Sequence, residues 1–577
     1  MKELMSGNDA LARGLYEAGC KLVSSYPGTP STEITESAAL YSEIDAEWAP
    51  NEKVAMEVAF GASLAGARSF CGMKHVGLNV AADPLFTISY TGVNGGMIIA
   101  VADDPGMHSS QNEQDSRNYA KASKIPMLEP SDSAEALAFA ARAYELSEQY
   151  DTPILMRMCT RIAHSRSIVE TSPRKEVPLR DYEKKPEKYI MMPAYAKRRH
   201  PVVEARTAAL TELAESDPIN FITWGDKRLG VITSGTSYQY VREALGDSVS
   251  ILKLGMVYPL PVQKILDFAS QVDRLAVVEE LDPFIETHVR ALGLDVIGKD
   301  TFSMIGELSV NTVKAALGTN APEVTPLNET LPMRPPAMCA GCPHRGLFYT
   351  LSKKKLRVLG DIGCYTLGAQ APLSAMDATI CMGASVSSLH GFNKVRGEES
   401  TKNTVAVIGD STFMHSGMTG LVNVSYNATN STVIILDNSI TGMTGHQENP
   451  TTGKNLKGEV AAKVDLEALC HALGIRRVRV VDPYDLAACD AAVTEELAAD
   501  EPSVIISRRP CVLLKSVKPA PALKVDTDKC KSCRACMKIG CPAISMKDGR
   551  AFVDNTLCTG CGVCRQLCRF DAFASEA

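Results

Sequence analysis

The sequence predicts a multidomain α/β protein that ends in a cysteine-rich tail. A chain of 577 residues is long enough for three or four domains, each with its own core. Apolar, strand-like runs alternate with segments of helical spacing through most of it, and this alternation is typical of parallel sheets. Eight of the 18 cysteines fall in the last 48 residues, which separates the tail from the rest of the chain.

The composition is that of an ordinary soluble protein. The hydrophobic fraction is 45% and the charged fraction 22%, and the net charge of −7 offers no basic surface for nucleic acid. No run of about 18 apolar residues is present to span a membrane, and the opening MKELMSGNDALARGL lacks the apolar core of a signal peptide. We therefore expect a cytoplasmic protein, in which clustered cysteines stay reduced and serve metal or redox chemistry rather than disulfides.

Composition shifts and proline-rich stretches divide the chain. DALARGLYEAGC has helical spacing, KLVSSYP predicts a short strand, and GGMIIAVADDPG and TPILMRM predict buried strands. A charged arm with several prolines follows, and RLGVITSGTSYQYVREAL then begins a second α/β unit with a strand, a glycine turn and a helix. The predicted regions are an α/β domain (1–165), an arm (166–225), a second α/β domain (226–320), a linker (321–337), a third α/β domain (338–516) and the tail (521–577).

The tail contains the only internal repeat, two CxxCxxC runs that are each followed by a further cysteine. This order resembles a bacterial-type ferredoxin with two [4Fe–4S] clusters, in which the fourth ligand of each cluster comes from the other run. A pair of zinc knuckles is the alternative. Four residues separate Cys536 from Cys541 where three are usual, and no proline follows Cys568. The resemblance implies one cluster on Cys530, Cys533, Cys536 and Cys568, and one on Cys558, Cys561, Cys564 and Cys541.

A second motif lies in the third α/β domain. Gly409, Asp410 and Ser411 follow the apolar run TVAVI, and Asn438 ends the next such run, 28 residues after Asp410. Strand ends on one sheet edge are where α/β folds bind ligands, and carboxylate and amide oxygens suit Mg²⁺ with a diphosphate. An Asp and an Asn that merely form turns are the alternative.

The spacing resembles the thiamine-diphosphate motif, GD followed by N. It implies that Asp410 and Asn438 are Mg²⁺ ligands, with the backbone carbonyl of Ile440 as the third. Directly behind Asn438, TGMTG supplies Gly442 and Thr444 in a segment that would pass close to the phosphates.

Thiamine enzymes also need a carboxyl group that donates a proton to the aminopyrimidine ring of the cofactor. In related enzymes it lies on the pyrimidine-binding domain, and Glu52 in NEKVAMEVAFGAS matches that motif. By itself, Glu52 has a less favoured interpretation as an ordinary helix-start carboxylate. Glu57 on the same predicted helix is the other candidate, with a structural role as the stronger interpretation.

Together these parts resemble the 2-oxoacid:ferredoxin oxidoreductases, most closely the α subunits of the indolepyruvate branch. The resemblance covers the whole chain through YPGTPSTE, NEKVAMEVAFGAS, MKHVGLNVAADP, CAGCPHRG, GDIGC, GDSTFMHSG and the tail. It implies a pyrimidine-binding domain, a transketolase-C-terminal-like domain, a diphosphate-binding domain and a ferredoxin domain. The implied reaction converts an arylpyruvate and coenzyme A to an arylacetyl-CoA and CO₂ and reduces ferredoxin. A smaller β subunit is expected, in an α2β2 assembly.

The resemblance also implies residue roles. Thr29, in YPGTP, matches a threonine that hydrogen-bonds the 2-oxoacid near its carboxylate. Arg117 is a candidate carboxylate clamp, with a solvated surface arginine as the favoured alternative. Four histidines lie in cofactor-side motifs and serve either acid–base steps or structure: His75, His344, His415 and His446.

Cysteines outside the tail suggest a third cluster. Related enzymes hold a proximal [4Fe–4S] cluster beside the thiamine, and an electron leaving the cofactor needs an acceptor nearby. Scattered buried cysteines that pack like small hydrophobes are the alternative. The matching residues are Cys339, Cys342, Cys364 and Cys511.

Other functions remain open at this stage. A related oxidoreductase acting on pyruvate, 2-oxoglutarate or branched 2-oxoacids would share these motifs, because pocket shape sets the substrate. Non-oxidative decarboxylation would leave the tail without a purpose. From a different class, an electron-carrier or docking subunit would bind no thiamine diphosphate.

Overall fold

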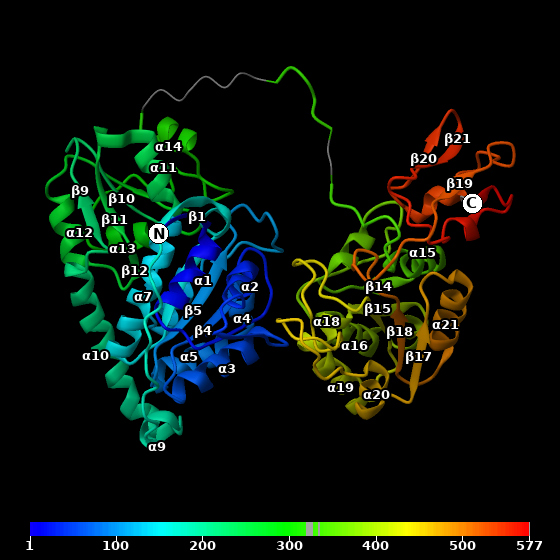
Figure 1. The fold of residues 1–577 in the computed structure, drawn as a ribbon, viewed down its shortest axis with the longest axis horizontal. Helices are drawn as coiled ribbons and strands as arrows, with labels where there is room; N and C mark the ends of the chain where they lie inside the picture. Colours follow the sequence, from blue (N-terminus) through cyan, green and yellow to red (C-terminus); the bar gives the residue numbers. More distant parts are fainter. Residues whose placement is uncertain (319–326, 333–334, 576–577) are drawn as a thin grey trace. The chain divides into compact units, whose positions relative to one another are not determined.

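The computed structural model describes residues 1–318, 327–332 and 335–575. The chain forms two compact units, Met1–Asn328 and Glu329–Ala577, and each is an α/β structure in its own right (Figure 1). Much of the predicted linker 321–337, namely residues 321–326 and 333–334, lies outside the described residues.

The first unit is built on a seven-stranded sheet in the order β12-β6-β7-β5-β4-β2-β3. Every neighbouring pair is parallel except β12 and β6. Strands β4, β5 and β7 are buried along their whole length, as expected for a parallel sheet covered on both faces. The strands are β2 (Leu22–Ser25), β3 (Asp45–Trp48), β4 (Ser69–Lys74), β5 (Met97–Asp103), β6 (Met127–Leu128), β7 (Ile154–Cys159) and β12 (Met256–Tyr258).

Helices cover both faces of this sheet (Figure 1). Several begin at side-chain caps: Ser6, Asn51 and Asp132 accept hydrogen bonds from the first turns of α1, α3 and α7. The helices are α1 (Gly7–Glu17), α2 (Thr32–Ala38), α3 (Glu52–Leu64), α4 (His75–Val80), α5 (Ala82–Thr91), α6 (Arg117–Ser123), α7 (Ser133–Tyr150) and α8 (Thr160–His164).

The predicted arm 166–225 is more structured than its composition indicates. Its first residues form β8 (Arg166–Glu170), which pairs antiparallel with β1 (Lys2–Ser6). After α9 (Pro186–Tyr189), the long helix α10 (Pro193–Ser216) packs against α5 and α12. The arm therefore ties the end of the first α/β region to its beginning and to the next region.

The second α/β region has a four-stranded sheet in the order β13-β10-β11-β9, in which only β9 is antiparallel. Strand β12 follows β11 in the chain but pairs with β6 of the first sheet. One hydrophobic core contains residues of both sheets, among them Val101, Leu155, Ile232 and Phe268. Its elements are β9 (Phe221–Thr223), β10 (Gly230–Ser234), β11 (Ser250–Leu254), β13 (Leu275–Val278), α11 (Gly235–Leu245), α12 (Val262–Ala269), α13 (Phe284–Ala291) and α14 (Val310–Ala316).

The second unit contains a five-stranded, fully parallel sheet in the order β14-β15-β16-β18-β17. Separate hydrophobic clusters lie on its two faces. Its elements are β14 (Arg357–Leu359), β15 (Thr404–Gly409), β16 (Thr432–Asp437), β17 (Arg477–Val481), β18 (Ser503–Arg508), α15 (His344–Lys354), α16 (Ala384–Arg396), α17 (Glu398–Thr401), α18 (Asp410–Thr412), α19 (Met418–Tyr426), α20 (Leu466–Ala472) and α21 (Leu486–Ala498).

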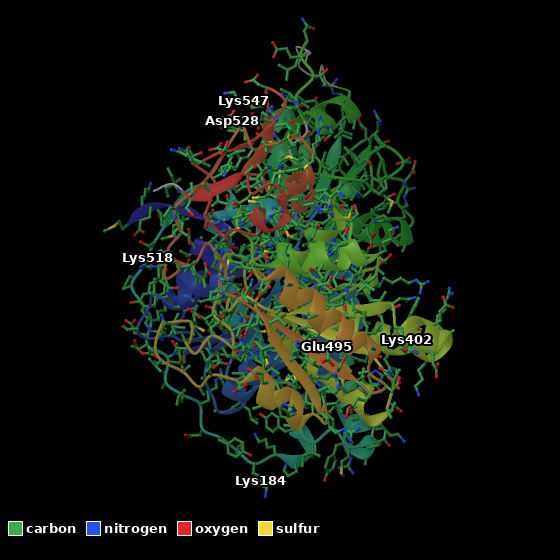
Figure 2. All side chains as sticks on the ribbon, turned by 90° about the vertical axis from the view of Figure 1, so that its right-hand side faces the viewer. Lys184, Lys402, Glu495, Lys518, Asp528 and Lys547 are labelled. Atoms are coloured by element: carbon green, nitrogen blue, oxygen red, sulfur yellow. The ribbon has the colours of Figure 1, made fainter. Side chains whose placement is uncertain are left out.

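The tail forms two small antiparallel sheets that pack on the same unit. Strand β19 (Leu523–Val525) pairs with β22 (Phe573–Ser575), and β20 (Ile544–Lys547) pairs with β21 (Arg550–Val553). Their core combines cysteines such as Cys530 and Cys564 with apolar side chains such as Ile539 and Phe573. Charged residues such as Asp528 and Lys547 lie on the outside (Figure 2). Within the described residues, no helix combines the length and apolar character needed to cross a bilayer.

Candidate functional site

In the first unit, the predicted site residues gather where β2 and β4 end. These strands are parallel neighbours, so their carboxyl ends share one sheet edge, the usual ligand edge of α/β folds. Thr29 lies half-buried in the turn after β2, and Lys74 is the last residue of β4. A Cβ atom placed on Gly28 would lie 3.1 Å from the Lys74 Cβ atom, so the YPGTP turn and Lys74 are in direct contact.

Glu52 is the first residue of α3, and only 5% of it is exposed. Its carboxyl group lies against Gly77 of α4, where an added Cβ would come within 2.6 Å of Glu52 Oε1. Because Gly77 has no side chain, the carboxyl group of Glu52 can occupy this space. Glu57 differs, because it is half-exposed and lies 3.8 Å from the ammonium group of Lys53. Of the two candidates, only Glu52 is held inside the protein.

Lys74 and His75 carry buried polar groups beside that edge. The Lys74 ammonium donates to the carbonyl oxygen of Ser109, and no carboxylate of the described residues lies within 4 Å of it. Burial lowers the pKa of Lys74 to about 8, an effect that Asp104 partly opposes. His75 Nε2 lies 3.2 Å from the Asn112 carbonyl oxygen, and the buried Nδ1 atom has no partner among the described residues. MKHVGLN is among the motifs of the resemblance, but sequence analysis did not single out its lysine.

Arg117 is not a surface residue, and the favoured interpretation of it was wrong. It is completely buried, lies 2.6 Å from Asp115, and also pairs with Glu279. Its guanidinium further donates to the carbonyl oxygens of Glu280 (2.9 Å) and Asp282 (3.1 Å). These contacts join α6 to the end of β13, and they leave Arg117 fully occupied within the protein. A buried arginine of this kind has no signature in a single sequence.

In the second unit, four adjacent strands end at the same edge and deliver most of the predicted ligands. Cys364 follows β14, Asp410 follows β15, Asn438 follows β16, and Cys511 follows β18. The Cys511 N–H donates to the Asn438 carbonyl oxygen at 2.9 Å, which ties the last two segments together. Gly442 lets the following loop approach the first strand end, since a Cβ there would lie 3.4 Å from Cys364 Sγ.

Three oxygen-bearing groups converge at this edge. The amide end of Asn438 lies 2.7 Å from the Ile440 carbonyl oxygen and 3.2 Å from Asp410 Oδ1. If the amide nitrogen of Asn438 occupies this position, it donates hydrogen bonds to the Ile440 carbonyl oxygen and to Asp410 Oδ1. If the amide oxygen occupies it, three oxygen atoms meet, and a cation stabilises such an arrangement. Thr451, which sequence analysis missed, donates to Asp410 Oδ2 at 3.1 Å. Burial, together with the nearby Asp437, raises the pKa of Asp410 to about 7.

The segment after Asn438 is held by hydroxyl contacts. Thr441 donates to the Ser411 hydroxyl at 2.9 Å, which joins the GDS and TGMTG motifs. Thr444 donates to Gln447 Oε1 at 2.5 Å. Gln447 and Thr451 have no motif around them, so only the fold could identify them.

The histidines differ in environment. His344 is buried against the edge of the Tyr365 ring, and burial lowers its pKa to about 4, so it is neutral near pH 7. His415 is buried with Nδ1 2.5 Å from the Ser416 hydroxyl. His446 is exposed, and its Nε2 lies 4.0 Å from Cys511 Sγ.

The four cysteines of the predicted third cluster approach one another within the second unit. The pKa of Cys364 is raised chiefly by burial and further by the proximity of Cys339 and Cys511, and that of Cys342 by burial and then by Cys339 and Cys364. Among the described residues, no three His, Cys, Asp or Glu side chains meet at single-ion distance. In the tail, the cysteines instead surround cavities.

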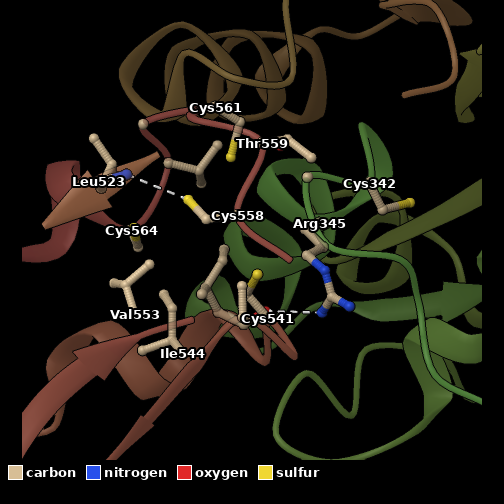
Figure 3. Close-up of a pocket in the computed structure, with 15 residues that line it drawn as sticks. Cys342, Arg345, Leu523, Cys541, Ile544, Val553, Cys558, Thr559, Cys561 and Cys564 are labelled. Carbon is tan, nitrogen blue, oxygen red and sulfur yellow. Dashed lines mark hydrogen bonds between the residues drawn. The ribbon is translucent and has the colours of Figure 1, made fainter. Parts of the chain in front are cut away.

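Two cavities in the tail are each lined by four of its cysteines. One is lined by Cys541, Cys558, Cys561 and Cys564 (Figure 3). The other is lined by Cys530, Cys533, Cys536 and Cys568. Backbone N–H groups point at several of the sulfurs: Leu523 and Gly560 donate to Cys558, Ala551 donates to Cys530, and Ala572 donates to Cys568, all at 3.4–3.5 Å. Amides directed at sulfur and a cysteine-lined space fit thiolate-bound iron–sulfur clusters.

Comparison with known proteins covers both units. Residues 13–217 match the family described as pyruvate flavodoxin/ferredoxin oxidoreductase, thiamine diphosphate-binding. Residues 361–507 match the C-terminal TPP-binding domain of thiamine pyrophosphate enzymes. The two α/β regions that contain Glu52 and Asp410 are thus both thiamine-diphosphate-related domains.

Full-length relatives are more specific. The chain is 40% identical to the indolepyruvate oxidoreductase subunit IorA of Archaeoglobus fulgidus, over 98% of this chain and 96% of that protein. The IorA subunits of Methanothermobacter marburgensis (39% identity, 99% and 97% coverage) and Pyrococcus horikoshii (38%, 99% and 96%) are similar over the same extent. The predicted resemblance is confirmed, and the chain belongs to the family of indolepyruvate oxidoreductase IorA subunits.

Proposed function

We propose that this chain is the thiamine-diphosphate-binding subunit of an indolepyruvate:ferredoxin oxidoreductase. It oxidatively decarboxylates arylpyruvates such as indolepyruvate, phenylpyruvate and hydroxyphenylpyruvate with coenzyme A, forms the arylacetyl-CoA and CO₂, and reduces ferredoxin. The substrate class follows from the names of relatives that match nearly the whole chain at 38–40% identity. A smaller β subunit completes the enzyme, and the region 226–320 serves as its transketolase-C-terminal-like domain.

The observation that carries this proposal is the edge shared by β14, β15, β16 and β18. Its oxygen atoms, from Asp410, Asn438 and Ile440, fit Mg²⁺ with the diphosphate of the cofactor. Gly409, Ser411, Gly442 and Thr444 lie in the two segments that would pass beside the phosphates. When bound, thiamine diphosphate supplies a thiazolium ring that accepts the electron pair released by decarboxylation.

In the first unit, Glu52 would hold the proton that the aminopyrimidine ring of the cofactor requires. Its side chain is buried and confined by Gly77, so the carboxyl group is positioned rather than free in solvent. Thr29 would donate to the 2-oxoacid near its carboxylate. His75 lies on the same edge, with one ring nitrogen still without a partner among the described residues.

Iron–sulfur clusters bound by the cysteines would accept the electrons released by the oxidation. Soft thiolates in groups of four suit [4Fe–4S] clusters, and one-electron acceptors are what a ferredoxin-linked oxidation needs. The tail would hold two clusters in a bacterial-type ferredoxin domain. Cys339, Cys342, Cys364 and Cys511 would hold a third beside the cofactor site.

Anaerobic viologen reduction tests the proposal, with the β subunit and coenzyme A present and a panel of 2-oxoacids. We expect rapid reduction with arylpyruvates and little with pyruvate, 2-oxoglutarate or branched 2-oxoacids. The opposite preference would reject the substrate class. Protein without bound thiamine diphosphate, but with iron–sulfur clusters, would support an electron carrier instead. Iron analysis should give about twelve atoms per chain, whereas about eight would remove the third cluster.

A matched pair of glutamate variants tests the role of Glu52. Glu52→Gln keeps the shape of the side chain but cannot exchange the proton, and general acid–base catalysis contributes about 10²- to 10⁴-fold. We therefore expect a loss of turnover in that range with unchanged cluster absorbance. Glu57→Gln, five residues along the same helix and half-exposed, should retain activity. Equal activity in the two variants would remove Glu52 from the mechanism.

A further inference from the structure

Arg345, the second residue of α15, is a buried cation that has no carboxylate partner among the described residues. Only 4% of it is exposed, and within the described residues all its hydrogen-bond acceptors are backbone carbonyl oxygens. Two lie on its own segment, Met338 and Cys339 (3.1 Å), and two belong to the tail, Ile539 (3.3 Å) and Gly540 (2.5 Å). Burying a guanidinium is costly unless an opposite charge lies nearby.

The surroundings of Arg345 show where such a charge would be. Arg345 and Cys342 line the same cavity as Cys541, Cys558, Cys561 and Cys564, and Figure 3 shows the guanidinium beside Cys541. The other cysteine-lined cavity of the tail is lined by tail residues alone. Arg345 therefore borders one predicted cluster site and not the other.

The contact also involves the unusual feature of the tail sequence. Four residues separate Cys536 from Cys541, and Gly540 takes a left-handed conformation (φ +66°) at the end of that loop. Arg345 binds the carbonyl groups of Ile539 and Gly540, the last two residues of the loop. The longer loop thus places its carbonyl groups, and Cys541 directly after them, against the guanidinium.

We propose that Arg345 raises the reduction potential of the cluster bound by Cys541, Cys558, Cys561 and Cys564. A thiolate-bound [4Fe–4S] cluster is negatively charged and gains one more negative charge when it accepts an electron. A buried positive charge beside Cys541 stabilises the reduced form more than the oxidised form, because the low-dielectric surroundings screen it weakly. The inference rests on the proposed function only in that the tail carries clusters; it holds for any electron donor.

The test is an anaerobic redox titration of the full chain, followed by electron paramagnetic resonance, with iron content measured in each variant. For Arg345→Gln we expect at least a tenfold lower reduced-to-oxidised ratio of one cluster at a fixed potential, which equals a shift of about 59 mV to more negative values. The other cluster of the tail should titrate unchanged. An unshifted titration of all clusters in the loaded variant would overturn the proposal.

Two control variants test whether the effect requires a charge that is both buried and beside the cluster. Arg206 is also a buried arginine that donates to backbone carbonyls, those of Ser89 and Asp151, but it lines neither of the two cysteine-lined cavities. Lys547 is an exposed charge on the tail itself (Figure 2). Arg206→Gln and Lys547→Gln should leave every cluster potential unshifted, and a shift as large as that of Arg345→Gln in either would overturn the specific role of Arg345.

A loss of iron in Arg345→Gln would be resolved by Arg345→Lys, which keeps the positive charge. Retention of the cluster at nearly the wild-type potential in Arg345→Lys would support the charge effect. Loss of iron from both variants, or a lysine variant with a fully shifted potential, would overturn it. Absence of any [4Fe–4S] signal in the wild-type chain would instead reject the proposed ferredoxin tail, so the two failures are distinguishable.

Discussion

Two buried carboxylates of the first unit, those of Asp103 and Asp115, meet guanidinium groups, whereas the carboxylate of Asp410 in the second unit meets oxygen and amide groups. Asp103 lies 2.7 Å from Arg157, and Asp115 lies 2.6 Å from Arg117. Asp410, equally buried, has the Asn438 amide, the Ile440 carbonyl and the Thr451 hydroxyl around it, and no basic side chain of the described residues within 4 Å. Ion pairs that are complete within the protein serve its structure, whereas an uncompensated buried charge at the carboxyl edge of a parallel sheet indicates where a ligand binds.

The same comparison applies to cations within the first unit. Lys253 is fully buried and lies 2.6 Å from Glu135, a complete pair. Lys74 is nearly as buried but contacts a carbonyl oxygen instead of a carboxylate. By this criterion we expect Asp410 and Lys74, but not Arg117, to contact a ligand. Variants of these three residues test the distinction.

The largest effect is expected at Asp410. Removing an outer partner of a metal ligand typically costs about 10- to 100-fold in affinity. Asp410→Ala removes a proposed direct ligand, so it should weaken binding of Mg²⁺-thiamine diphosphate at least about 100-fold. Equilibrium dialysis of thiamine diphosphate in the presence of Mg²⁺ measures this. Asp465→Ala, which removes an exposed helix cap in the same unit, should lower stability slightly but bind the cofactor normally. Equal cofactor affinities in the two variants would contradict the Mg²⁺ site.

Arg117 should affect stability instead of binding. Arg117→Met leaves the buried carboxylate of Glu279 without its arginine and leaves Asp115 with only Arg157, 3.9 Å away. Breaking a buried pair in this way costs about 3–5 kcal/mol. A large decrease in the urea midpoint is the expected result. Arg228→Met removes an exposed pair with Asp226 and should leave the urea midpoint nearly unchanged, because water screens such pairs. If Arg117→Met unfolded at the wild-type midpoint, the distinction between compensated and uncompensated charge would fail.

The difference between Arg117 and Asp410 also explains what the sequence could predict. Asp410 and Asn438 are placed by their own strands, so strand-like runs and a 28-residue spacing were sufficient to predict that they share a sheet edge. The pairing of Arg117 with Glu279 joins residues 162 positions apart, in regions that sequence analysis treated as separate domains. Strand β12 escaped prediction for the same reason, because it joins a sheet whose other strands come more than 95 residues earlier. Long-range contacts that no motif marks were not predictable from this one sequence.

The smallest of the three effects is expected at Lys74, and it should appear in substrate affinity. A hydrogen bond to a charged group is worth about 1.5–3 kcal/mol, so Lys74→Met should raise KM for an arylpyruvate roughly 10- to 100-fold if its ammonium binds the carboxylate beside Thr29. The free ammonium has a pKa of about 8 and binds a carboxylate only when protonated. Wild-type kcat/KM should therefore fall as pH rises through about 8, and Lys74→Met should lose this limb of the profile.

Lys299 is the matched control, since its ammonium also donates to a backbone carbonyl, that of Glu279, and its pKa is likewise lowered by burial. Lys299→Met should keep both KM and the pH profile. If Lys74→Met also kept them, the ammonium would be a structural contact to the Ser109 carbonyl, and absence of a carboxylate partner would not suffice to identify a ligand site in this unit.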